Sequence, residues 1–169
     1  MIDCTLLDVD DCDEIVSWNI NTDVSFLQQW AGKIYTYPLT KEQIIKRIKK
    51  ESKSDEYIYK IYENNQIIGT IELFNIDYIN MKCKIGRFLI KLDYQNKGYG
   101  KRILETIISK SYKELGLNTF NLSVFDYNQN AINCYLRYGF IITGKDKRIL
   151  PNGGNAEVFN MVYQIKEEN

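Results

Sequence analysis

Histidine is absent from this chain of 169 residues, and its four cysteines, at positions 4, 12, 83 and 134, form no CxxC pair. Zinc sites built from histidines and paired cysteines are therefore improbable, and the sequence predicts no metal. A cysteine nucleophile would lack the histidine that usually activates it, so Cys134 is a poor candidate for that role. Isolated cysteines are instead expected to be reduced and partly buried.

The chain also lacks a long apolar run, a basic amino-terminal region and an excess of either charge. No stretch reaches the length of a membrane-spanning helix, and the acidic start predicts no signal peptide. Lys and Arg together number 22, as do Asp and Glu, whereas sequence-independent binding to nucleic acid needs a basic surplus. We therefore expect a cytoplasmic protein that binds neither membranes nor nucleic acid.

Linkers rich in proline or serine, internal repeats and low-complexity tracts are missing too, which predicts a single domain over residues 1–169. Apolar alternation and turn residues predict strands, whereas apolar stripes and capping residues predict helices. The expected strands are Ile2–Asp8, Tyr57–Glu63, Gln66–Ile76, Met81–Lys91, Phe120–Val124, Phe140–Lys147 and Ala156–Gln164, with turns at Asn64-Asn65 and Pro151-Asn152-Gly153-Gly154.

The expected helices are one capped by Asp10, then Lys41–Glu51, Lys101–Leu115 ending at Gly116, and Asn130–Tyr138. The resulting order is strand, helices, three strands, helix, strand, helix and two strands. It predicts a mixed, mainly antiparallel α/β sheet of about six to seven strands, with helices on both faces.

One glycine-rich turn carries the strongest chemical signal. The string QNKGYG, from Gln95 to Gly100, follows a strand-like run and opens a helical run. Such a turn leaves backbone N–H groups unpaired at the positive end of a helix dipole, where a phosphate or pyrophosphate can bind. Gly98 and Gly100 allow an anion to approach the backbone closely. The neighbouring cations are Lys97, Lys101 and Arg102.

Spacing excludes two familiar phosphate motifs at this turn. A Walker P-loop requires GxxxxGK[ST], which the chain does not contain, and Ile103 occupies the place of the third glycine of the dinucleotide fingerprint GxGxxG. Taken alone, the turn is equally compatible with an ordinary helix start.

A second string, NQNAINCYLRYGF from Asn128 to Phe140, lies beyond the next predicted strand. Together, QxxGxG and NxxAxxxYxxxGF resemble the acetyl-CoA-binding half of the GNAT N-acetyltransferase superfamily, and the predicted element order resembles its fold. The resemblance implies that the turn binds the pyrophosphate of coenzyme A, that the strand end pairs with the pantetheine arm, and that the helix Ala131–Tyr138 flanks the thiol. The implied cofactor-binding residues are Phe88, Leu89, Ile90, Gln95, Asn96, Lys97, Gly98, Tyr99, Gly100, Lys101, Asn128 and Tyr135.

Tyr135 fills the tyrosine position of the second motif, and the resemblance implies that its phenol protonates the departing thiolate. A phenol of pKa ~10 is protonated at neutral pH and can donate to a thiolate whose acid has a pKa near ~8.5. The alternative is that Tyr135 packs in the core. Asn128 can bond pantetheine or, equally, cap the following helix.

The general base is not indicated by the resemblance, because Lys84 stands where many relatives carry a glutamate. Glu72, on the preceding predicted strand, is an alternative base if its side chain faces the cleft. It could equally be a solvated glutamate on the outer face. A chain of water molecules could also remove the proton, since an amine needs no strong base.

The acceptor is expected to be an amine-bearing small molecule or peptide. The aromatic segment Phe26–Thr40 resembles those of ribosomal-protein-type acetyltransferases, and Trp30, Tyr35 and Tyr37 could face a cationic amine or simply hold this segment to the sheet. The sequence therefore predicts an acetyl-CoA-dependent N-acetyltransferase, as a monomer or homodimer. The alternative is a module that binds acyl-CoA without catalysis, which the lysine at position 84 would suit.

Overall fold

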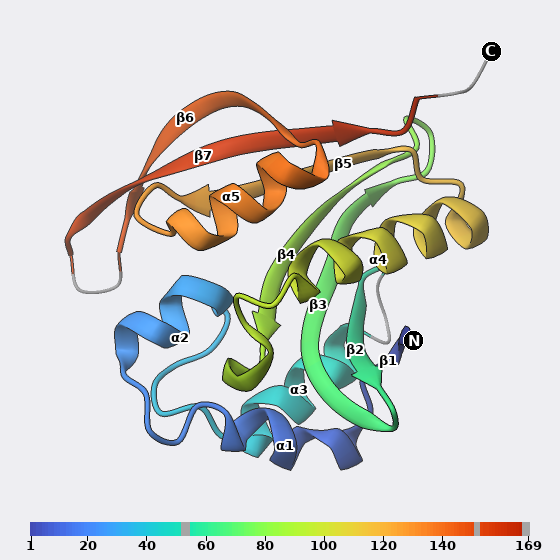
Figure 1. The fold of residues 1–169 in the computed structure, drawn as a ribbon. Coiled ribbons are helices and arrows are strands. Elements are labelled where there is room, and N and C mark those ends of the chain that lie inside the picture. Colours follow the sequence, from blue (N-terminus) through green and yellow to red (C-terminus); the bar gives the residue numbers. More distant parts are fainter. Residues whose placement is uncertain (52–54, 151–152, 167–169) are drawn as a thin grey trace.

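The computed structural model describes residues 1–51, 55–150 and 153–166. A seven-stranded sheet runs through it in the order β1-β2-β3-β4-β5-β7-β6 (Figure 1). Every neighbouring pair is antiparallel except β4 and β5, which are parallel. The strands are β1 (Ile2–Leu6), β2 (Tyr57–Glu63), β3 (Gln66–Asp77), β4 (Lys82–Ile90), β5 (Thr119–Phe125), β6 (Ile141–Ile149) and β7 (Asn155–Gln164).

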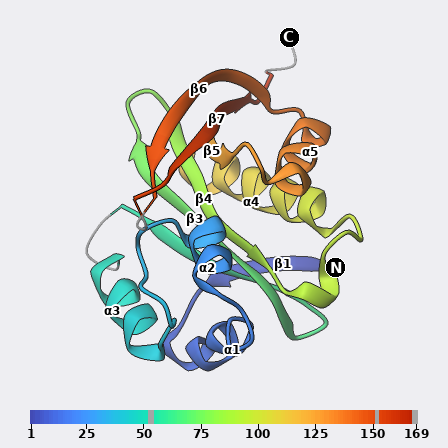
Figure 2. The same cartoon turned by 90° about the vertical axis from the view of Figure 1, so that its left-hand side faces the viewer.

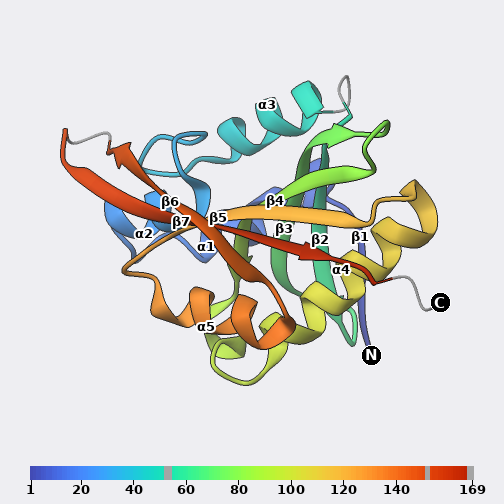
Figure 3. The same cartoon turned by 90° about the horizontal axis from the view of Figure 1, so that it is seen from above.

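Helices cover both faces of this sheet (Figure 3). One face carries α4 (Tyr99–Leu115) and α5 (Gln129–Tyr138), and the other carries the three short amino-terminal helices. Those are α1 (Cys12–Ser17), α2 (Val24–Ala31) and α3 (Lys41–Glu51), and two single 3-10 turns occur at Val9–Asp11 and Leu92–Tyr94. The predicted fold class, a mixed and mainly antiparallel α/β sheet, is confirmed.

Two separate apolar clusters hold the helices to the sheet. The stripe of α4, with Ile103, Leu104, Ile107 and Ile108, is almost fully buried against residues of β3, β4 and β5. Burying each of these side chains stabilises the fold by about 1.5–3 kcal/mol, which is enough to fix this helix firmly on the sheet. The second cluster joins α1, α2 and α3 to the opposite face around Ile58.

The predicted strands and long helices are confirmed, with small shifts at their ends. Asn64 and Asn65 both have positive φ, 50° and 62°, as a tight hairpin turn between β2 and β3 requires. Gly116 ends α4 with φ 70°. Of the predicted turn before β7, Pro151 and Asn152 lie outside the described residues.

Two features near the amino terminus differ from the prediction. The cap expected at Asp10 is wrong, because Asp10 lies inside a 3-10 turn and α1 begins only at Cys12. Helix α2 was not expected as a separate element. Its start is fixed by Asp23, whose carboxylate accepts a hydrogen bond from Phe26 N at 2.8 Å. Within the described ranges, no helix combines the length and apolar character that crossing a membrane requires.

Candidate active site

The two parallel strands separate at the middle of the sheet. β4 pairs with β5 only where Lys82–Lys84 lie beside Thr119–Asn121, although both strands continue well beyond that point. Figure 1 shows the two strands turning apart, and Figure 2 shows the helices of the two faces on either side of the sheet. The space between them belongs to a cavity of about 1280 Å³, larger than the roughly 300–1,000 Å³ typical of small-molecule sites.

A bulge in β4 produces this separation. Glu72 pairs with Gly86 and Thr70 pairs with Leu89, so the single residue Ile71 of β3 opposes two residues of β4, Arg87 and Phe88. Arg87 has φ 47°, an unusual conformation for a residue with a side chain. Bulges bend a strand and increase its twist, which turns the end of β4 away from β5.

Beyond the bulge, successive peptide groups of β4 point in turn towards β3 and towards the cavity. Lys91 N donates to Ile68 O of β3 at 2.8 Å, and a Cβ added to Gly69 would lie 2.6 Å from Leu89 O. Residues 89 and 91 therefore face β3, and the peptide groups of Phe88 and Ile90 face the other way. Ile90 O accepts a bond from Gln95 Nε2 at 2.8 Å. An extended ligand can thus pair with this edge of β4 as an added strand.

The glycine turn presents main-chain donors at the end of this edge. Gln95 N donates to Leu92 O, whereas the N–H groups of Asn96, Lys97 and Gly98 make no hydrogen bond to any residue that the structure describes. Gly98 has φ 80° with open space around its Cα, and α4 begins directly after it. Consecutive unpaired donors before a helix are able to bind an anion, which is the arrangement that the predicted phosphate site requires.

The three cations near the turn differ in their surroundings. Arg102 is bound to Glu63 at 2.9 Å and stacks on the Tyr99 ring, and Lys97 Nζ donates to Asp93 O at 2.7 Å. Lys101 lines the cavity and forms no ion pair with any described residue. The cavity is lined by ten of the predicted cofactor-binding residues: Phe88, Leu89, Ile90, Gln95, Asn96, Gly98, Gly100, Lys101, Asn128 and Tyr135. Lys97 and Tyr99 are not among the residues that line it.

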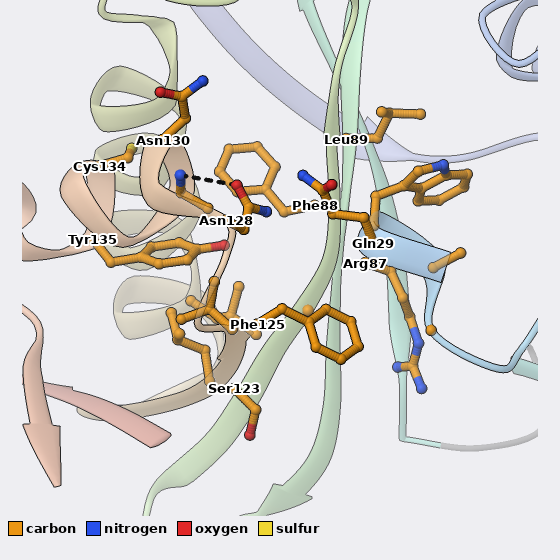
Figure 4. A pocket seen from close by; sticks show the side chains of 18 of the residues that line it. Gln29, Arg87, Phe88, Leu89, Ser123, Phe125, Asn128, Asn130, Cys134 and Tyr135 are labelled. Carbon is orange, nitrogen blue, oxygen red and sulfur yellow. Dashed lines mark hydrogen bonds between the residues drawn. The ribbon is translucent and has the colours of Figure 1, made fainter. Parts of the chain in front are cut away.

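Tyr135 enters the cavity from α5. The residue is 8% exposed, and its ring packs edge-on against Phe140 at 5.7 Å between centroids. Its hydroxyl points into the cavity (Figure 4) and forms no hydrogen bond with any residue in the described part of the chain. Burial raises the pKa of the Tyr135 phenol above its ordinary value, so the group stays protonated and able to donate.

Cys134 and Asn128 belong to the same helix as Tyr135, Cys134 within α5 and Asn128 at its N-cap. Burial raises the pKa of the Cys134 thiol, which disfavours the thiolate that a nucleophile needs. Asn128 caps α5, since its Oδ1 accepts a bond from Ala131 N at 3.3 Å (Figure 4). The cap is therefore present. The amide nitrogen of Asn128 bonds to no described residue, so it remains available to a ligand.

Glu72 does not line the cavity but contacts Arg87, which does. Its side chain is 3% exposed and contacts two guanidinium groups, Arg47 at 2.8 Å and Arg87 at 3.2 Å. Arg87 lines the cavity and also stacks on Phe74 at 4.1 Å, whereas Glu72 is not among the lining residues. Protonating Glu72 would weaken both ion pairs, which makes this carboxylate a poor acceptor of protons.

The aromatic segment between α1 and α3 contributes two aromatic residues to the cavity lining, Phe26 and Trp30. Trp30 lines it, and its Nε1 donates to Asn19 Oδ1 at 3.1 Å. Tyr35 is buried against Trp30, and the Tyr37 hydroxyl donates to Thr22 O at 2.9 Å. Both tyrosines thus have structural contacts that hold this segment in place.

Several lining residues had no recognisable signal in the sequence. They come from α2 and the turn after it, from the outer half of β5 and from the end of β6, which approach the cavity only through the tertiary fold. Apart from Trp30, nothing in their local patterns separates them from surface residues. They include Gln29, Lys33, Ser123, Phe125, Lys147 and Arg148.

Comparison with known proteins identifies similar chains. The profile of the acetyltransferase (GNAT) family matches residues 24–140. Acetyltransferase PseH of Campylobacter jejuni is 27% identical over 105 residues, which cover 62% of each chain. A probable spermine N(1)-acetyltransferase of Bacillus subtilis subsp. natto is 32% identical over 77 residues, or 46% of this chain and 51% of that one. The chain thus spans about half to two thirds of the length of these curated relatives.

Solved structures show the same fold. Spermidine N-acetyltransferase from Vibrio cholerae, in complex with CoA and spermine, matches with a TM-score of 0.81 at 20% identity, covering 96% of this chain and 95% of that one. A structure of the Vibrio cholerae enzyme described as dodecameric has a TM-score of 0.76 at 22% identity, with 96% and 93% coverage. These comparisons give no support to the predicted ribosomal-protein-type subgroup.

Proposed function

Because the chain belongs to the acetyltransferase (GNAT) family, we propose that it transfers an acetyl group from acetyl-CoA directly to a primary amine. The observation that carries this proposal is the alignment of three features along one cavity. Unpaired N–H groups occur at the glycine turn, a free peptide edge runs along β4, and an unpartnered phenol projects from α5. Acetyl-CoA bound along this cavity would meet, in order, donors for its pyrophosphate, a strand edge for its pantetheine arm and an acid for its thiolate.

The anchor in this proposal is the turn from Gln95 to Lys101. The N–H groups of Asn96, Lys97 and Gly98 bind the pyrophosphate, with Lys101 adding positive charge. Gln95 supports the strand end through Ile90 O, and Tyr99 supports the start of α4 through its bond to Glu63 at 2.6 Å. The Cβ-free Gly100 lets α4 approach α5.

The peptide groups of Phe88 and Ile90 on the edge of β4 then pair with the pantetheine arm and direct the thioester towards Tyr135, while Leu89 between them pairs with β3. A cavity-facing N–H beyond the bulge can donate to the thioester oxygen as negative charge develops there. Asn128 supplies a further amide group from α5. Holding the two reactants together can remove about 7–11 kcal/mol of the barrier in favourable cases.

The chemical step forms one bond and breaks one. The neutral amine nitrogen attacks the thioester carbonyl, the N–C bond forms, and the C–S bond breaks with both electrons leaving on sulfur. Tyr135 donates its proton to the thiolate, and water carries the proton lost by the amine back to the phenolate. We propose water for this role, because Glu72 is occupied by Arg47 and Arg87 and instead positions Arg87 at the cavity.

Two wider features of the proposal concern the whole protein. We propose a single catalytic domain over residues 1–169, because one sheet includes strands from Ile2 to Gln164. We also propose a cytoplasmic location, since all four cysteines are free, as a reducing compartment would leave them.

The oligomeric state, monomer or homodimer, stays a prediction, which light scattering on the purified protein tests.

Thiol release measured with acetyl-CoA and a panel of amines tests the proposed activity. Turnover with at least one primary amine, giving one N-acetyl product per thiol released, is the expected result. Absence of coenzyme A binding at millimolar concentration would refute the proposal. Tight binding of coenzyme A without acetylation of any amine would favour the non-catalytic acyl-CoA-binding module.

A further inference from the structure

The cavity is strongly cationic. Among the described residues that line it, seven are lysine or arginine and none is aspartate or glutamate. The chain as a whole carries as many acidic as basic residues, so this one-sided lining is a property of the cavity rather than of the composition. A concave surface lined by one sign of charge concentrates ligands of the opposite sign.

These cations fall into two groups on different elements. Lys101 on α4 and Arg137 on α5 lie on the side of the glycine turn, where the phosphates of coenzyme A account for them. The other five come from the turn after α2, from β4 and from β6, and Figures 1 and 3 show α2 close to the end of β6 and the start of β7, away from α4. They are Lys33, Lys84, Arg87, Lys147 and Arg148.

Three cations of this second group retain uncompensated charge. Arg87 is paired with Glu72, and Lys147 faces Glu157 across the β6–β7 pair. Lys33, Lys84 and Arg148 are exposed and form no ion pair with any residue in the described ranges. Their charges are therefore free to act on a ligand in the cavity.

The face on which Lys84 lies places it away from the pyrophosphate anchor. Its neighbours Cys83 and Ile85 belong to the buried cluster beneath α4, and side chains alternate along a strand. Lys84 therefore points to the opposite face of the sheet, the one covered by α1, α2 and α3. A cation at this place is suited to bind a negative charge of the acceptor rather than the phosphates of coenzyme A.

From this arrangement we propose that the acceptor is a primary amine that also carries a phosphate or carboxylate group. The inference rests on the proposed acetyl transfer and specifies its substrate class. Lys33, Lys84 and Arg148 attract the anion, while the amine of the same molecule reaches the thioester beside Tyr135. A polyamine, which carries only positive charge, is repelled by the same residues and is disfavoured as an acceptor.

Matched amines test this inference. Thiol release is measured at saturating acetyl-CoA with ethanolamine against phosphoethanolamine, with cadaverine against lysine, and with spermidine. We expect kcat/KM to be about tenfold higher for the anionic member of at least one pair, as one or two exposed charge contacts allow. The pair that shows the difference identifies phosphate or carboxylate as the preferred anion.

Charge-reversal variants show whether these residues cause the preference. Lys33→Glu and Arg148→Glu are expected to raise KM for the preferred amine about five- to thirtyfold, with KM for acetyl-CoA unchanged. Lys113→Glu, an exposed substitution in the last turn of α4 and outside the cavity, is the matched control and should change neither constant.

The outcomes separate the inference from the proposed function. If spermidine or cadaverine is acetylated as efficiently as the anionic amines, the inference is overturned while the proposed function stands. The inference is equally overturned if both charge reversals leave KM for the anionic amine unchanged. If coenzyme A binds but no amine in the panel is acetylated, the proposed function fails and the substrate class fails with it.

Discussion

A Cβ added to Gly100 would lie 2.6 Å from the Sγ of Cys134. The first turn of α4 therefore packs so closely against α5 that a side chain at position 100 would displace the Cys134 thiol, and this contact links the proposed anchor for coenzyme A to the helix that carries Tyr135. Gly100→Ala should lower the free energy of unfolding by about 1–3 kcal/mol, because the thiol must move. Urea denaturation measures the loss, and Cys134→Ala in the same chain should restore most of it. Failure of this rescue would contradict the contact.

Gly98 and Gly116 form a matched pair for testing the anion site. Both have positive φ, 80° and 70°, and open space where a Cβ would go. Alanine at either position should cost about 1–2 kcal/mol of stability through backbone strain. Only Gly98→Ala should also weaken coenzyme A binding in calorimetry, because only Gly98 belongs to the turn. Equal affinities in the two variants would argue against a phosphate cradle at this turn.

Tyr135→Phe should lower kcat by about 10²- to 10⁴-fold, the usual contribution of a general acid. The hydroxyl forms no hydrogen bond with the described part of the chain, so thermal stability should change little. Tyr138→Phe, on the same helix, is the control. A tyrosine that only packs in the core would tolerate the loss of its hydroxyl with kcat unchanged.

The pH profile gives a second test of Tyr135. Burial raises the pKa of this phenol above that of an ordinary tyrosine, so it stays protonated through the pH range in which an ordinary tyrosine is protonated. We therefore expect kcat, measured at saturating amine, not to fall between pH 7 and about pH 10, the ordinary pKa of tyrosine. A decrease in that range that is absent from Tyr135→Phe would mean that the phenol ionises earlier than its surroundings imply.

Glu72→Ala should destabilise the protein by about 3–5 kcal/mol, since it leaves the guanidinium groups of Arg47 and Arg87 without this shared carboxylate. Glu114→Ala removes the exposed partner of Lys110, at 2.7 Å, and should cost less than about 1 kcal/mol. Chemical denaturation compares the two. Similar small losses would show that Glu72 contributes little to positioning Arg87.

Local patterns explain why much of the fold was predictable. The turn at Asn64-Asn65, the cap at Gly116 and the buried stripe of α4 each depend on residues close together in the sequence. The same is true of the glycine turn. Its donors are unpaired because of the short-range geometry of a helix start.

The remaining features depend on contacts between distant residues. The positive φ of Arg87 follows from how β4 pairs with β3, and the role of Glu72 depends on Arg47, 25 positions away. Helix α2 is only eight residues long, with Leu27 and Ala31 facing inward, so its periodicity is weak. The cationic lining assembles from α4, α5, β4, β6 and the turn after α2, which no local pattern connects.

The most direct test of the central claim follows the backbone amides of the glycine turn by nuclear magnetic resonance during titration with coenzyme A. We expect the N–H resonances of Asn96, Lys97 and Gly98 to shift downfield as the pyrophosphate accepts their hydrogen bonds, whereas that of Gly116 stays in place. Saturation with coenzyme A that leaves these three resonances unchanged would show that the pyrophosphate does not bind at this turn.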